Sequence, residues 1–294
     1  MPTYNRADVL VRTLEHLEAQ TWTDFEVVVV DDGSTDSTPK VLERFQQRTK
    51  LNLRSLRQPN RGPARARNVA IAALRAPVCL MIGDDILASP DFVLTHLQLH
   101  ERRPDISVAA LGLTRWSESG QRVTSFMRWL DESGIQFGYQ DLLHGKQPDW
   151  RYFYTSNLSA KTKLLRDNPF NEDFTKPAME DIELAYRLQT RCGLQIAFLP
   201  DAVAHHVHPT SFDQACRRMV SVGVGSREFH TIWKECQPPP RPWVIRQVRR
   251  IIADHPGLIT PFRFLVALLT RFWCPNPLMR IVLRCYYTIG YLQH

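Results

Sequence analysis

The first third of the chain alternates between two patterns, and this alternation restricts the fold more than any other feature of the sequence. Apolar residues at helical spacing are followed by short runs rich in β-branched residues, which are typical of buried strands. A repeated helix–strand order predicts an α/β fold, with a Rossmann-like, mostly parallel sheet flanked by helices on both faces. The expected helices are 8–20, 37–47 and 64–74, and the expected strands are 25–30, 51–56 and 78–82.

Later elements are less regular. We expect strands at 107–114, 194–199 and 202–208 and helices at 180–191 and 212–230, whereas 116–150 gives no clear order. The chain opens at residues 1–6, which read as the loop that follows a strand. Either the first strand of the sheet is missing or truncated, or the sheet is built without it.

A proline-rich break at 238–242 separates two regions of different character. We expect a catalytic domain at 1–235 and an amphipathic helical region at 236–294, in which apolar clusters alternate with arginines. Such helices can lie on a membrane surface or pack on the preceding domain. A peripheral membrane contact is slightly favoured.

The composition limits the classes of binding partner that the chain is expected to have. The 294 residues carry a net charge of +7, which suits nucleotide phosphates or an anionic membrane surface. No basic run with interleaved aromatic residues favours nucleic acid. The six cysteines form no CxxC pair, so a reducing compartment is the simplest interpretation. With no signal-peptide pattern, we expect a cytoplasmic protein, either free or peripheral on the inner face of the cytoplasmic membrane.

Two adjacent carboxylates, Asp84 and Asp85, end the expected strand at 78–82. Paired carboxylates at the end of a buried strand cost free energy unless they are compensated, and Mg²⁺ or Mn²⁺ is a usual compensation. A metal at the carboxyl edge of such a sheet can hold the diphosphate of a nucleotide. The alternative is a polar turn before a helix that starts near Ser89 and Pro90.

Three further groups bear on this site. Asp31 and Asp32 also end a buried strand, where they can accept a hydrogen bond from a nucleotide base or cap the next helix. In a Gly-Pro loop that opens a helix, the side chains expected to contact or support a diphosphate are Arg61, Arg67 and Asn68, and Arg65 is expected to be solvated.

A histidine cluster lies on the extended segment 202–208, where His206 and His208 share one face. Imidazole is a common ligand of transition metals, so these two residues are candidate metal ligands, His206 first.

Taken in order, several motifs resemble those of the family 2 glycosyltransferases over about residues 2–225. They are PTYNR at 2–6, VDDGSTD at 30–36, NRGPARARN at 60–68, GDD at 83–85, ED at 180–181 and PDAVAHH at 200–206. The resemblance implies the A-type glycosyltransferase fold of nucleotide-diphospho-sugar transferases, here with a C-terminal helical extension. It also implies that Thr3, Asp31 and Asp32 lie along the nucleotide base.

The resemblance assigns the remaining roles. Asp181 corresponds to the base that removes the acceptor proton in an inverting transfer, and Glu180 supports it. The usual metal motif has an acid where this chain has Gly83, which leaves Asp85 as the direct ligand and Asp84 for ribose or metal-bound water.

We therefore expect a metal-dependent, inverting glycosyltransferase that uses a nucleotide-sugar, in first place a UDP-sugar, with Mn²⁺ or Mg²⁺. Its acceptor would be a glycan or lipid-linked hydroxyl in polysaccharide or cell-envelope assembly. The alternatives are an inactive nucleotide- or glycan-binding homologue and a nucleotidylyltransferase.

Overall fold

The computed structural model describes residues 1–174, 176–240, 242–270 and 276–292. Arg241, Arg271, Phe272 and Cys274, which belong to segments discussed above, lie outside these residues. The chain divides into two compact units. The sheet unit comprises Met1–Arg122, Asp131–Glu172 and Asp181–His208, and the helical unit comprises Val123–Leu130, Asp173–Glu180 and Pro209–His294.

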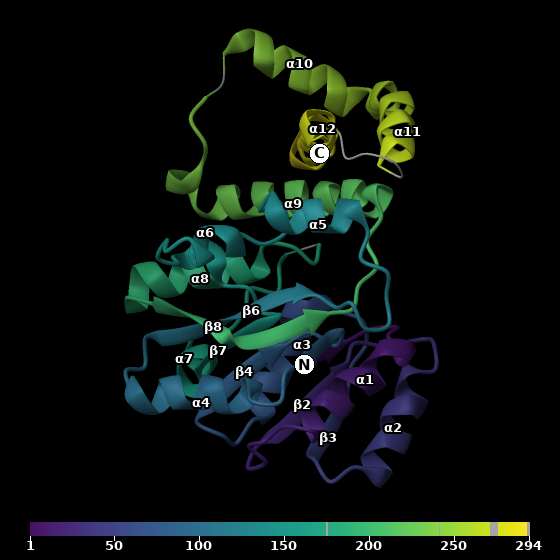
Figure 1. Ribbon diagram of the computed structural model, residues 1–294. Coiled ribbons are helices and arrows are strands. Elements are labelled where there is room, and N and C mark those ends of the chain that lie inside the picture. The colour runs from purple at the N-terminus through teal and green to yellow at the C-terminus, as the bar shows by residue number, and fades with distance from the viewer. Residues whose placement is uncertain (175, 241, 271–275, 293–294) are drawn as a thin grey trace. The chain divides into compact units, whose positions relative to one another are not determined.

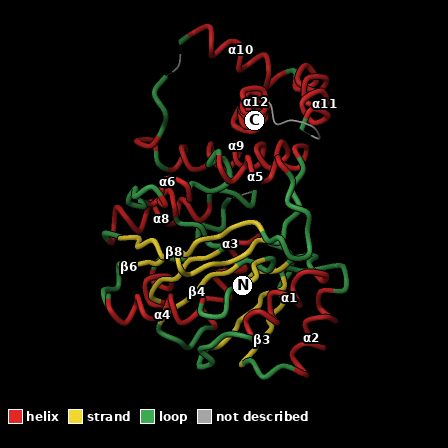
Figure 2. Tube along the Cα trace, in the orientation of Figure 1, coloured by secondary structure: helices red, strands yellow, loops and turns green. Residues whose placement is uncertain are grey.

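The sheet unit contains all the described strands, arranged in two sheets (Figures 1 and 2). A parallel sheet has the order β1-β2-β3, and a mixed sheet has the order β4-β7-β6-β8-β5. The strands are β1 (Pro2–Thr3), β2 (Glu26–Asp31), β3 (Asn52–Arg57), β4 (Val78–Ile82), β5 (Ile86–Ala88), β6 (Val108–Trp116), β7 (Asn157–Lys161) and β8 (Gln195–His206).

Helices cover both faces of the parallel sheet, as the alternation predicts. Val27 and Val29 of β2 pack against apolar side chains of α1 and α2, whereas Val28 and Val30 pack against Ala66 and Ala70 of α3. Period-2 alternation along β2 therefore supplies two hydrophobic cores. The helices of this unit are α1 (Ala7–Glu18), α2 (Thr38–Arg48), α3 (Gly62–Ala73), α4 (Phe92–Arg102), α6 (Tyr139–Leu143), α7 (Thr162–Asp167) and α8 (Glu180–Cys192), with a 3₁₀ turn at Trp150–Tyr152.

Three local expectations are corrected. Residues 1–6 are not entirely a loop, because Pro2 and Thr3 pair in parallel with Val30 and Asp31. The two extended pieces at 194–199 and 202–208 are one strand, β8, whose pairing with β6 skips from Leu199 to Val203. Strand β7, where the sequence pattern predicted no element, pairs antiparallel with β4 and β6.

The helical unit contains α5 (Ser125–Glu132), α9 (Phe212–Ile232), α10 (Trp243–Asp254), α11 (Thr260–Leu269) and α12 (Asn276–Leu292), with 3₁₀ turns at Lys234–Cys236 and Pro256–Ile259. Its centre is a close crossing of α9 and α12. A Cβ atom added at Gly290 would lie 2.0 Å from the carbonyl oxygen of Val220, and one at Gly223 would lie 2.2 Å from that of Tyr287. Only glycine lets these two backbones approach so closely.

None of the helices among the described residues could cross a membrane alone, judged by length and hydropathy. The segments Trp243–Asp254 and Pro256–Leu269 meet those criteria only when taken together, and they are bent by 94° at the break between them.

Candidate active site

The structure brings the three predicted metal ligands together at the end of the mixed sheet. Strand β5 pairs antiparallel with β8, and the amide of Val207 donates to the carbonyl oxygen of Asp85 at 2.8 Å. This pairing places Oδ2 of Asp85 3.3 Å from Nε2 of His206 and 3.3 Å from Nδ1 of His208. One ligand atom from each residue lies within 4.8 Å of the other two.

Arg6 belongs to the same cluster, and the sequence interpretation did not single it out. Its Nη2 lies 3.3 Å from Nδ1 of His208 and 3.6 Å from Oδ2 of Asp85. The signal was present, because Arg6 ends the first motif of the chain. It compensates part of the carboxylate charge in this structure.

The position of the His208 Nδ1 atom tests whether a cation fits. A guanidinium can only donate to that nitrogen, and a carboxylate can only accept from it. One nitrogen cannot satisfy both neighbours at once. A divalent cation removes this conflict, because both the imidazole lone pair and the carboxylate can then be ligands. Two ligand atoms at right angles on a cation with bonds of about 2.1 Å lie about 3 Å apart, close to the observed separations. The residues therefore fit a cation.

The two neighbouring aspartates differ in their electrostatics. Burial raises the pKa of Asp84, and repulsion from Asp85 raises it further. Burial acts in the same direction on Asp85, but the contacts from His206 and His208 hold the pKa of that carboxyl below its ordinary value. Asp85 therefore carries the negative charge of the pair, as a direct metal ligand should.

A stacked indole orients His206. The ring of Trp116, at the end of β6, lies parallel to the imidazole with 5.2 Å between centroids and 7° between planes. Gln121 Nε2 donates to the carbonyl oxygen of His206 at 2.7 Å. Sequence reasoning missed Trp116, because the strand predicted at 107–114 stops two residues before it.

Asp31 and Asp32 lie at the end of β2 as predicted, and both organise backbone. Asp31 Oδ1 accepts from the amide of Ser34 at 2.8 Å, and its Oδ2 lies 3.5 Å from Nε of Arg57. Asp32 accepts from the amides of Arg61 and Gly62 at 2.9 and 2.8 Å, so it caps α3 rather than α2. Its carboxylate therefore fixes the Gly-Pro loop.

The three side chains predicted around the diphosphate differ in their contacts. Arg61 is exposed, and Arg67 lies over the ring of Phe170 at 5.5 Å. Asn68 exchanges hydrogen bonds with the backbone of Phe170. Arg65, expected to be solvated, pairs with Glu172 at 2.9 Å and is about half exposed.

Thr3 and Asn5 flank the turn after β2. The side chain of Thr3 is buried, and its hydroxyl acts on Asp84, where it partly offsets the rise in the pKa of that carboxyl. Asn5, at φ 53°, accepts from the amides of Thr35 and Asp36 and thereby ties residues 34–36 to the first loop. Asparagine tolerates this left-handed backbone better than most residues.

The predicted base stands at the start of α8. Met179 has φ 72°, a strained value for this residue type, and the helix begins at Glu180, which is buried. Oδ1 of Asp181 accepts from the amide of Ile182 at 2.9 Å. A helix N-terminus favours a negatively charged side chain at this position. One turn on, Glu183 and Arg187 form an ion pair at 3.1 Å.

Comparisons with known proteins identify the family of the chain. A family model described as glycosyl transferase family 2 matches residues 1–174. The chain is 29% identical over 255 residues to YfnE, an uncharacterized glycosyltransferase of Bacillus subtilis, which covers 72% of this chain and 64% of that protein. It is 33% identical over 223 residues to a validoxylamine A glucosyltransferase of Streptomyces hygroscopicus. This alignment covers 64% of this chain and 50% of that protein. The chain thus spans about half to two thirds of the length of these relatives.

Solved structures show the same fold. The mannosyltransferase PcManGT from Pyrobaculum calidifontis, in complex with GDP-Man and Mn²⁺, superposes with a TM-score of 0.66 at 19% identity and covers 99% of this chain and 85% of its own. Residues 1–349 of TarS from Staphylococcus aureus, in complex with UDP, give a TM-score of 0.54 at 18% identity, with 98% and 88% covered. The fold is therefore the A-type glycosyltransferase fold with a C-terminal helical region.

Proposed function

The chain belongs to glycosyl transferase family 2, and we propose that it moves a sugar from a nucleotide-sugar donor to a hydroxyl acceptor with inversion at the anomeric carbon. The observation that carries this proposal is the convergence of His206 and His208 on Oδ2 of Asp85, each at 3.3 Å. Imidazole and carboxylate donors suit Mn²⁺, and carboxylate also suits Mg²⁺.

Different residues of the chain have different roles in the sugar transfer. When bound, the cation neutralises charge that develops on the leaving nucleoside diphosphate. Arg6 adds a fixed positive charge beside the same site, 3.6 Å from Asp85. Asp181 takes the proton of the acceptor hydroxyl as its oxygen attacks, a role that the helix N-terminus supports by favouring the carboxylate before the transfer. Glu180 precedes it and supports its position.

We assign UDP as the nucleotide. Asp31 and Thr3 stand side by side at the ends of β2 and β1, paired in the strand register. A carboxylate and a hydroxyl can accept from and donate to the edge of a uracil. The UDP complex of TarS and the GDP-Man complex of PcManGT belong to those proteins and make UDP and GDP the first two nucleotides to compare.

The test is turnover by the full chain with UDP- and GDP-sugars, in Mn²⁺, Mg²⁺ or EDTA. Asp181→Asn should lower kcat by about 10²-fold or more while nucleotide affinity is kept. Asp91→Asn, at the start of α4, is the matched control and should keep full turnover. Nucleotide binding without turnover in the unsubstituted chain would favour an inactive binding homologue, and release of inorganic diphosphate would favour a nucleotidylyltransferase.

We further propose that the helical unit docks on an anionic membrane, which would bring a lipid-linked or cell-envelope acceptor to the site. Helix α10 contacts α12 through Arg249, whose Nε donates to Thr288 at 3.3 Å. Its apolar residues Val244, Val248 and Ile251 are 62%, 50% and 52% exposed. On α11 the exposed side chains are Phe264, Leu265 and Leu268. Apolar faces flanked by arginine suit an interfacial helix.

Vesicle co-sedimentation tests this docking. The full chain should bind vesicles that contain phosphatidylglycerol more strongly than vesicles of phosphatidylcholine alone. The double substitution of Val248→Asp and Ile251→Asp should abolish binding, whereas Ile106→Asp, at an exposed site of the sheet unit, should not. Equal binding by all three proteins would contradict the proposal.

A further inference from the structure

The proposed base, Asp181, follows a segment that belongs to the helical unit. That unit includes Asp173–Glu180, whereas the sheet unit resumes at Asp181. Within this segment Ala178 is buried and Met179 has a left-handed φ of 72°. A methionine keeps such a backbone only where its surroundings hold it there. The contacts of residues 176–179 therefore determine where α8 begins and, with it, where Asp181 lies.

Helix α9 contacts this segment through a glycine. Gly225 is buried, and a Cβ atom added to it would overlap the carbonyl oxygen of Ala178 and lie 3.2 Å from Cβ of Met179. Only glycine lets α9 approach the segment this closely. Any side chain here would push the two backbones apart, so Gly225 defines the distance between α9 and the two residues that precede Glu180.

Arg218 makes a second contact from the same face of α9. Residues seven apart lie on one face of a helix, so Arg218 and Gly225 face the same side. Nη1 of Arg218 donates to the carbonyl oxygen of Pro177. The amide of Ala178 donates to the carbonyl oxygen of Lys176 at 2.7 Å, which bends the chain at this point. Two successive carbonyl groups, those of Pro177 and Ala178, are thus held by α9.

Helix α9 can serve as a fixed support because other contacts hold it in place. Its first turn is closed by a capping box. Asp213 pairs with Arg263 of α11 at 2.8 Å. Gly223 packs on the backbone of α12, and a helix turns by about 200° over two residues, so Gly223 and Gly225 face opposite sides. One side of α9 therefore packs on α12, and the other side carries residues 177–179.

Given the role of Asp181 proposed above, on which this assignment depends, we infer that Gly225 and Arg218 are positioning residues for the base. They fix the backbone of residues 177–179 and thereby the place from which the Asp181 carboxylate reaches the acceptor hydroxyl. A general base has to lie within hydrogen-bond reach of the proton that it removes, and a misplacement of about 1 Å can lower a rate about 10²-fold. Small shifts of this segment should therefore change kcat more than nucleotide binding.

The first test is Gly225→Ala, whose added methyl group has to displace the carbonyl group of Ala178. We expect kcat to fall about tenfold, while the affinity for UDP with Mn²⁺ changes by less than about twofold. Turnover is UDP release from the UDP-sugar that the unsubstituted chain uses fastest, and the affinity comes from calorimetry. Gly223→Ala is the matched control, because its methyl group meets Tyr287 of α12 instead, and it should keep kcat. Equal losses of kcat in both variants would overturn the inference.

Arg218→Met covers the case in which Gly225→Ala folds poorly, because Arg218 is exposed. Methionine keeps an apolar stem but cannot donate to Pro177. We expect kcat to fall about fivefold with unchanged UDP affinity, and Arg218→Lys, which retains a donor, should recover most of this loss. Arg227→Met, on the same helix, is the control and should keep kcat. Full kcat in Arg218→Met would contradict the inference.

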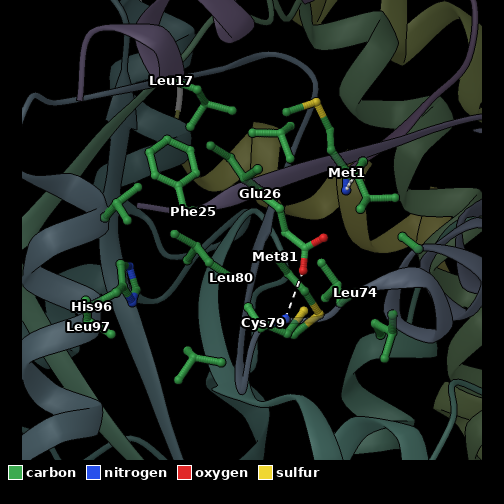
Figure 3. A pocket seen from close by; sticks show the side chains of 18 of the residues that line it. Met1, Leu17, Phe25, Glu26, Leu74, Cys79, Leu80, Met81, His96 and Leu97 are labelled. Carbon is green, nitrogen blue, oxygen red and sulfur yellow. Dashed lines mark hydrogen bonds between the residues drawn. The ribbon is translucent and has the colours of Figure 1, made fainter. Parts of the chain in front are cut away.

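A loss of stability alone should not imitate these effects. Leu17, which is buried, lines an apolar pocket of about 400 Å³ in the sheet unit (Figure 3). Leu17→Ala should lower Tm through the loss of buried apolar contacts but keep kcat at a temperature well below Tm. If Leu17→Ala loses kcat as Gly225→Ala does, with UDP affinity retained, the loss follows stability and the inference is overturned.

A double substitution separates this inference from the proposed function. If Gly225 acts through Asp181, adding Gly225→Ala to Asp181→Asn should lower the remaining turnover by less than about twofold, because the carboxylate that it positions is already gone. A further loss of about tenfold would indicate another role for Gly225 and would overturn the inference. Full turnover of Asp181→Asn would contradict the proposed base, and the inference with it. Loss of turnover in Asp181→Asn, with full kcat in Gly225→Ala and Arg218→Met, would overturn the inference alone.

Discussion

Two pairs of histidines in the sheet unit show how the surroundings decide what an imidazole does. His96 and His100 lie one turn apart on α4, and both are buried. His96 contacts Oγ of Ser159 and Oδ1 of Asn157, each at 2.9 Å, and His100 contacts the same Oγ at 2.9 Å. The side chains that share these hydrogen bonds, Ser159 and Asn157, are neutral.

His206 and His208 lie two residues apart at the end of β8 and meet a carboxylate instead. Both approach Oδ2 of Asp85 at 3.3 Å, with Arg6 alongside. In the first pair, burial lowers the pKa of each histidine to about 4, so both rings are neutral parts of the core. In the second pair, the ring nitrogens face a charge that a cation can share. Spacing alone would favour the first pair, because i, i+4 histidines on a helix are a common metal pattern.

Removing the carboxylate should have the largest effect. Asp85→Asn keeps the shape of the side chain but removes its charge, so we expect turnover with Mn²⁺ to fall about 10³-fold, equivalent to about 4 kcal/mol of transition-state stabilisation. The measurement is kcat/KM over a Mn²⁺ titration. Retention of wild-type activity that is still abolished by EDTA would place the metal elsewhere.

The buried pair, His96 and His100, should make the folded protein less stable at low pH. Burial lowers the pKa of His96 from 6.5 to about 4. Between these values the unfolded chain binds a proton that the folded chain does not, so stability is full above pH 6.5 and falls as the pH drops toward 4. The loss is roughly 3 kcal/mol for one such group.

Urea denaturation at pH 7 and pH 4.5 measures this loss. His96→Gln lacks the titrating group and should show a smaller difference between the two pH values than the wild type. His144→Gln, at an exposed position after α6, should retain the wild-type difference. If His96→Gln behaves like the control, the ring is not held neutral by the core.

The adjacent histidines of β8 sharpen the comparison within one strand. His206→Gln removes a proposed ligand, and we expect Mn²⁺ affinity to fall about 10- to 100-fold, as for loss of a residue in or next to a metal shell. His205→Gln is the matched control, because alternation along the strand turns His205 to the opposite, exposed side. Equal losses in both variants would contradict the assigned face.

The smallest expected effect on Mn²⁺ affinity comes from removing the ring that orients His206. Trp116→Leu removes the ring stacked on His206 but leaves every ligand atom in place. Stacking of aromatic rings contributes about 0.5–1.5 kcal/mol, so Mn²⁺ affinity should fall about threefold. Calorimetric titration resolves this change in affinity. The control is Trp22→Leu, because Trp22 is 36% exposed, and this substitution should leave the Mn²⁺ affinity unchanged.

The histidine pairs also mark the limit of prediction from sequence. Elements with strong local patterns were predicted well: β4 has the predicted bounds, and α1, β2 and α2 lie within two residues of theirs. Strand β7 was missed because Asn157 and Ser159 look like solvent-facing residues. Both are fully buried, and the side chains that satisfy them come from α4, some 60 residues away in sequence. No local pattern carries that information.

The residues of the candidate site also fall into those that the sequence predicted and those that it did not. Asp85, His206 and His208 were predicted from residue types and strand ends, and the structure brings them together. Arg6 and Trp116 were not singled out, because their places depend on pairing between distant strands. Arg67 and Asn68 were predicted beside the diphosphate from the charge and polarity of their loop. Both contact Phe170 in the structure, and their contact with a diphosphate stays a prediction.

The backbone bond between Val207 and Asp85 has a consequence for how a cation at the proposed site would be exchanged. Backbone pairing between β5 and β8 holds Asp85 and His206 in register. Little conformational entropy of this main chain would then be lost on binding, so loading and removal of the cation would be reversible events in a folded protein. A chelator should therefore strip the ion and leave the sheet intact, in contrast to domains whose metal is a condition of folding.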